Sequence, residues 1–139
     1  MKKIFVVFLI LLLNLLFSVS VFAKLDLDTH RWKWITSNEK IGLFYDTQTV
    51  KKINDHLIEC WVCKYYPDGC KFHSFEHSHY SLELFDYREN KNALKMSIVK
   101  DAKGKEIKNY KVDKIEYSPI VPDTVGDVIA ITLKEDYRM

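Results

Sequence analysis

The chain has 139 residues, of which 29% are charged and 14% aromatic, with 21 Lys+Arg against 19 Asp+Glu. Lys2 and Lys3 lie in the leader that is described next, so its removal leaves 19 basic residues, equal to the 19 acidic ones. The charges are interspersed, and the longest basic run is Lys51–Lys52. Nucleic-acid binding requires a clustered basic surface, so the composition excludes it as a function.

Residues 1–23 have the layout of a secretory signal peptide. Two lysines precede a long apolar run that only Asn14 interrupts, and Val21 and Ala23 fit the −3 and −1 positions of a cleavage site. An uncleaved anchor is the alternative, because about 20 apolar residues span a bilayer. We predict an exported protein, periplasmic, surface-bound or secreted, that meets the membrane only through this segment.

Residues 24–139 are predicted to form a single β-rich domain. They hold all three Trp and all eight Tyr, enough aromatic surface for a core. Alternating apolar and polar residues between turn signals predict short strands. The predicted strands cover residues 32–35, 41–45, 47–53, 56–66, 80–87, 94–98 and 105–112. Their regular spacing indicates an antiparallel meander of about five to seven strands.

The period changes near the C-terminus, where residues 124–136 predict a helix. Apolar residues recur at helical spacing, and Thr124 is a suitable N-cap with Asp127 three positions on. The β-branched residues of this segment also suit a strand, which is the alternative. A helix would lay its apolar stripe on one face of the sheet, giving an α+β fold.

The stretch from Cys60 to His79 holds all three cysteines and three of the five histidines. Cys60 and Cys63 have the spacing of a redox pair, but side chains three apart in a strand point to opposite faces. We therefore expect no bond between them. The favoured prediction is one disulfide that involves Cys70, with Cys60 or Cys63 buried and the odd thiol free, or available to link a homodimer.

Metal binding by the same stretch has two readings. Cys60, Cys63, Cys70 and His73 have spacings that small zinc modules use, although a strand would splay the first two. A site made of His73, His77 and His79 is easier in an exported protein, because neutral imidazole binds zinc, copper and haem iron. The alternative is that residues 70–79 form a solvated loop without a ligand, in which case the protein has no cofactor.

Catalytic patterns are missing from the sequence. No serine lies in a Gly-x-Ser-x-Gly elbow, and the four glycines are too scattered to form a phosphate-binding loop. A dyad of Cys70 with a neighbouring histidine would be unusual, since such pairs are normally distant in sequence. We predict that the protein is not an enzyme.

The order of several short motifs resembles that of the surface-adhesin protein E family. The matching elements are Trp32 or Trp34, Leu43–Asp46, Glu59–Lys64, Leu94–Val99, Asp101–Lys105 and Tyr117–Thr124. The resemblance implies an antiparallel sheet packed by a C-terminal helix. It also implies binding of host matrix or serum proteins by at least some members.

The chain departs from the family pattern in its cysteines. Members often carry one cysteine after a Phe/Ile-Asp step and another near the C-terminus. At the corresponding places this chain has Phe85–Tyr87 and Ile131–Leu133, which contain no cysteine. Residues 70–79 look like additional loop, so binding properties of the family are not transferred to them. We predict a non-enzymatic, exported binding or adhesion module that contacts host or envelope proteins. The alternative is a periplasmic metal- or haem-binding protein that uses His73, His77 and His79.

Overall fold

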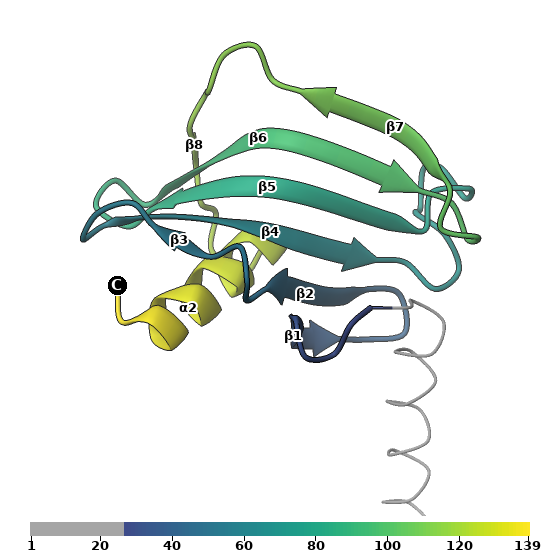
Figure 1. Ribbon diagram of the computed structural model, residues 1–139, viewed down its shortest axis with the longest axis horizontal. Helices are drawn as coiled ribbons and strands as arrows, with labels where there is room; N and C mark the ends of the chain where they lie inside the picture. Colours follow the sequence, from purple (N-terminus) through teal and green to yellow (C-terminus); the bar gives the residue numbers. More distant parts are fainter. Residues whose placement is uncertain (1–26) are drawn as a thin grey trace, which may run out of the picture.

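The computed structural model describes residues 27–139 (Figure 1). The predicted signal peptide, residues 1–23, lies outside the described residues. Within the described part, no helix is both long and apolar enough to cross a membrane.

Within residues 27–139, all strands belong to one antiparallel sheet, with one helix on one side of it (Figure 1). The strand order is β1-β2-β4-β5-β6-β7, with β3 added beside β4 and β8 beside β6. The elements are β1 (Trp32–Ser37), β2 (Gly42–Asp46), β3 (Lys51–Lys52), β4 (Leu57–Tyr65), β5 (Ser78–Asp86), β6 (Lys91–Lys100), β7 (Glu106–Lys111), β8 (Ser118–Pro119) and α2 (Val125–Tyr137). The predicted α+β class and the antiparallel meander are confirmed.

The sheet has eight strands, where about five to seven were predicted. The difference comes from β3 and β8, which have two residues each. The segment 47–53, predicted as a full strand, pairs only at Lys51–Lys52 because Asp46 starts a turn. The Asp46 backbone oxygen accepts from Thr49 N at 3.2 Å, and its side chain accepts from Gln48 N at 3.1 Å.

The predicted helix is confirmed within one residue at each end. Thr124 caps it, with its hydroxyl accepting from Asp127 N at 3.4 Å, while the Asp127 carboxylate accepts from Asp123 N at 3.0 Å. The helix ends at Arg138, whose φ of 51° is left-handed. These contacts satisfy backbone groups that a helix leaves free at its ends.

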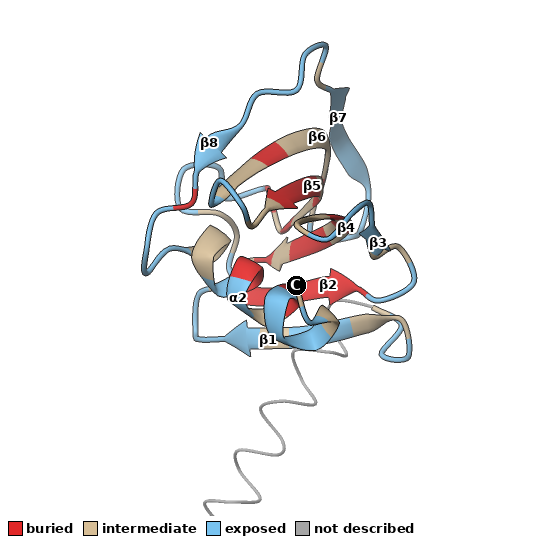
Figure 2. Cartoon of the chain, turned by 90° about the vertical axis from the view of Figure 1, so that its left-hand side faces the viewer, coloured by how far each residue is buried: buried red, intermediate tan, exposed pale blue. Residues whose placement is uncertain are grey.

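One face of the sheet, called here the helix face, packs against α2 (Figure 2). The helix contributes Ile129, Ala130 and Leu133 to the main core. The sheet contributes Tyr45 from β2, Ile58, Cys60 and Val62 from β4, and Phe85 from β5. Hydrogen bonds fix the helix on this core: Tyr45 Oη donates to Asp136 Oδ2 at 2.7 Å, and Tyr87 Oη to the Ala130 carbonyl at 2.8 Å.

The opposite face, called here the open face, has its own smaller cluster around Phe44, Cys63 and Tyr65. Paired residues in an antiparallel sheet share a face, so Tyr80, which pairs with Cys63, belongs to it. Cys60 packs in the helix-face core and Cys63 in the open-face cluster, which confirms that the two thiols point to opposite faces. Among residues 27–139, no helix or second sheet covers the open face.

Truncating the helix core should cost much more stability than truncating its outer face. Leu133 is fully buried, so Leu133→Ala should lower the free energy of unfolding by about 2–5 kcal/mol. Ile131 is 50% exposed on the same helix, and Ile131→Ala should change it by about 0.5 kcal/mol or less. Urea unfolding of both variants checks this; equal losses would contradict the packing of α2.

The Asp136 carboxylate should make folding weakly dependent on acid pH. Hydrogen bonds from Lys33 and then Tyr45 lower its pKa in the folded state. Its stabilisation is therefore present above the usual Asp pKa of about 3.9 and is lost as pH falls through the folded pKa. The difference in unfolding free energy between wild type and Asp136→Asn should shrink in acid. This difference should be small at every pH, because Lys33 is half exposed and solvent screens its interaction with Asp136.

Candidate functional site

The open face carries a hollow of about 430 Å³ between β1 and the middle of the sheet. Its apolar wall is made of Trp32, Trp61, Tyr80 and Ile98, which come from four different strands. All four side chains are partly buried. The remaining lining residues are Leu27, Asp28, Arg31, Asp46 and Lys100. We call this the open-face hollow.

Ring contacts fix the aromatic wall of the open-face hollow. Trp32 meets Tyr80 edge to face, with ring centroids 5.5 Å apart. Lys100 places its ammonium 4.8 Å from the centroid of the Tyr80 ring, within cation–π range. The hollow therefore combines rigid aromatic surface with a cation at its rim.

A buried carboxylate anchors the other rim. Asp46 is fully buried at the end of β2, and both of its oxygens accept from Arg31 Nε at 2.9 Å. Arg31 NH2 adds a third bond of 2.5 Å to Oδ2. Hydrogen bonding to Asp46 raises the pKa of Arg31 and holds the guanidinium in place. Asp28 and Asp46 balance Arg31 and Lys100 in the lining, and Lys100 lies over the Tyr80 ring.

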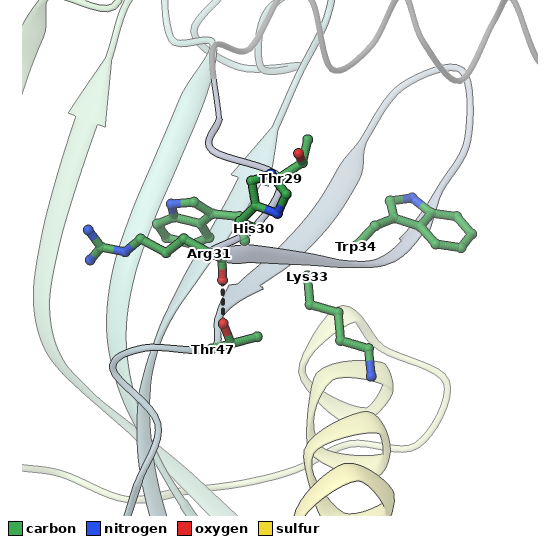
Figure 3. Close-up of a pocket in the computed structure, with 7 residues that line it drawn as sticks. Thr29, His30, Arg31, Lys33, Trp34 and Thr47 are labelled. Carbon is green, nitrogen blue, oxygen red and sulfur yellow. Dashed lines mark hydrogen bonds between the residues drawn. The ribbon is translucent and has the colours of Figure 1, made fainter.

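A second hollow, also of about 430 Å³, lies along β1 and shares Arg31 and Trp32 with the first. Figure 3 shows its lining, with Trp34 and Lys33 extending away from His30 and Thr29. Trp34 is 50% exposed. Thr47 Oγ1 donates to the Arg31 carbonyl at 2.7 Å and ties the segment before β1 to the end of β2. Trp34 pairs with Phe44 of the open-face cluster, so aromatic surface continues along β1 on the open face.

Of the residues singled out in the sequence, Cys60 and Cys63 lie within β4, whereas Cys70 and the three histidines lie in the β4–β5 loop or at the start of β5. Cys60 and Cys63 are fully buried, and burial raises the pKa of both thiols, that of Cys63 to about 12. Both are therefore poor nucleophiles. Cys70 is half-buried in the loop between β4 and β5.

The predicted disulfide of Cys70 is wrong for this fold, because all three thiols are free. Strand pairing explains the error. Cys63 lies opposite Tyr80, not Cys70, and the β4–β5 ladder closes at Tyr65 and Ser78. Cys70 sits beyond that point, in a small bridge with His73.

The three histidines occupy different settings. His73 is exposed in the loop, with its ring 5.9 Å from that of Phe75. His77 is half-buried, and its backbone N donates to the Lys100 carbonyl at 2.9 Å. His79 belongs to β5 and not to the loop that was predicted for it. In the described chain they form no tight ligand cluster; of the three, only His79 belongs to one.

The structure brings Cys70, Glu76 and His79 together instead, with potential ligand atoms all within 4.8 Å of one another. Glu76 is 3% exposed and was missed by the sequence reasoning. An acidic residue between His73 and His79 in a histidine-rich loop was the available signal. Its charge is paired by Lys108, which reaches it from β7 across 32 positions of sequence.

Comparison with models of protein families, with curated proteins and with solved structures gives no match for this chain. The resemblance to the surface-adhesin protein E family therefore stays a prediction.

Proposed function

We propose that the protein is an exported, non-enzymatic binding module that docks a protein partner in the open-face hollow. The observation that carries this proposal is the uncovered aromatic wall of Trp32, Trp61 and Tyr80 on a sheet whose other face is packed by α2. Interface cores are enriched in Trp, Tyr and Arg, and such side chains dominate binding energies.

Preorganisation supports the same function. The edge-to-face contact of Trp32 with Tyr80 and the bonds of Arg31 to Asp46 fix the walls before a partner arrives. Less conformational entropy is then lost on binding. Lys100 at the rim favours a partner segment that places an acidic group beside an apolar side chain.

Export rests on the signal-peptide pattern of residues 1–23. The partner is then an extracytoplasmic protein, either of the cell envelope or of a host matrix, which is also what the family resemblance implies. The alternative function, metal or haem binding by His73, His77 and His79, would need the loop to bring three rings to one ion. Docking in the open-face hollow needs no such rearrangement.

Capture of the partner should depend on the aromatic wall of the open-face hollow and on Lys100 at its rim. Trp61→Ala and Lys100→Glu should each reduce the amount of envelope or host-matrix protein retained by the immobilised chain. A hot-spot loss of about 2 kcal/mol corresponds to roughly 30-fold weaker binding. Quantitative cross-linking and titration with the retained protein measure the change.

Ile131→Ala is the matched control, because Ile131 is exposed on the outer side of α2. It should leave partner affinity unchanged. Circular dichroism spectra of all three variants should match wild type. Equal affinity of folded Trp61→Ala, Lys100→Glu and wild type would contradict docking in this hollow.

A further inference from the structure

The loop between β4 and β5 places a thiol, a carboxylate and an imidazole next to one another, away from the open-face hollow. Cys70 and Glu76 come from the loop, and His79 is the second residue of β5. Their potential ligand atoms lie within 4.8 Å of one another. In a tetrahedral site the ligand atoms lie about 2.0–2.3 Å from the ion and therefore closer to one another than 4.8 Å. Only small side-chain movements are needed to bring the three atoms to one ion.

Backbone hydrogen bonds hold the loop in this conformation. Cys70 N donates to the Glu76 carbonyl at 2.8 Å, which sets the two ligand-bearing residues opposite each other. His73 N donates to the Cys70 carbonyl at 3.1 Å, and Glu76 N to the His73 carbonyl at 2.9 Å. These three bonds fix the backbone from which both side chains extend.

Gly69 makes the tight turn before Cys70 possible. Its φ of +86° is left-handed, and a Cβ there would lie 2.1 Å from the Ser74 carbonyl oxygen. Since backbone cannot yield as a flexible side chain would, any other residue at this position must open the loop. The cluster is thus built on a rigid frame.

The contact between His79 and Glu76 is close but poorly aligned. His79 Nε2 lies 2.8 Å from Glu76 Oε2. Even so, this buried nitrogen has no hydrogen-bond partner of acceptable geometry in the described chain. A cation shared by Nε2 and the carboxylate would satisfy both groups.

Lys108 acts on the same carboxylate from β7. Its ammonium donates a hydrogen bond to Glu76 Oε1, which lowers the pKa of Glu76 and fixes the orientation of the carboxylate. Ligating carboxylates are typically oriented by such outer hydrogen bonds. Lys64 and Lys108 also add positive charge near His79, which the Glu76 carboxylate and a Cys70 thiolate would offset when a cation binds.

We propose that Cys70, Glu76 and His79 bind a divalent transition metal, zinc in the first place, with a fourth position open to water. Sulfur, nitrogen and oxygen donors together suit zinc, whereas magnesium and calcium prefer oxygen alone. The proposal is independent of the protein-binding function, since the two sets of residues do not overlap.

Titration of the reduced, purified chain with cobalt(II), and zinc competition against it, test the site. Wild type should bind one ion and show the thiolate-to-cobalt charge-transfer band of a Cys ligand. Cys70→Ser should abolish the band. Cys70→Ser, Glu76→Gln and His79→Asn should each lower the affinity for zinc by more than about 100-fold, which is beyond the usual effect of changing a residue that only contacts a ligand. His73→Ala and His77→Ala are the matched controls and should bind as wild type does.

The outcomes separate the alternatives. Wild-type binding in Cys70→Ser and Glu76→Gln would overturn the proposal, as would loss of binding in the two histidine controls, which would assign the metal to the loop histidines. No binding by the folded, reduced wild type would also overturn the proposal. Trp61→Ala should still bind zinc and Cys70→Ser should still capture the protein partner, so the two proposals can fail separately.

A thiol-reactivity measurement covers the case in which the Glu76 or His79 variants fail to fold. Zinc should slow alkylation of wild-type Cys70, identified by peptide mass spectrometry. Cys60 and Cys63 should stay unreactive with or without zinc, because both are fully buried. Alkylation of Cys70 at the same rate with and without saturating zinc would contradict its role as a ligand.

Discussion

Burial of β4 on both faces is the constraint on which the other elements depend. Ile58, Cys60 and Val62 pack beneath α2, while Cys63 and Tyr65 pack with residues of the open face. A slip of one residue in its pairing would exchange the two sets, so the register is strongly specified. Since β2, β3 and β5 all pair with β4, its register also sets theirs.

The two candidate sites follow from this register. Pairing of Cys63 with Tyr80 puts the Tyr80 ring on the open face, where Trp32 and Lys100 meet it. Pairing of Lys64 with His79 points His79 to the other face, toward Glu76 and Lys108. Adjacent residues of one strand therefore serve different sites on different faces, and a substitution at one site need not disturb the other.

Local patterns in the sequence were sufficient for the helix, its Thr124 cap and the alternation of β4. They could not show that β5 is packed on both faces. Ser81 and Glu83 are the polar residues of an alternating strand, yet both are buried, and Ser81 Oγ donates to Glu83 Oε1 at 2.5 Å. Periodicity gives the spacing of side chains and not what covers them. The candidate cluster of Cys70, Glu76 and His79 was missed for a related reason, because the partner that pairs the charge of buried Glu76 lies on a distant strand.

The helix α2 follows every strand in the chain, and this order has a consequence for folding. Until it docks, the apolar side chains of Ile58 and Phe85 remain in contact with water on a sheet that is already able to form. Such intermediates are prone to associate through open strand edges. The outer strand β7 counters this, since all of its residues are exposed and half of them are charged, which disfavours pairing with another chain. An edge strand that is exposed along its whole length thus protects the chain before its last element is in place.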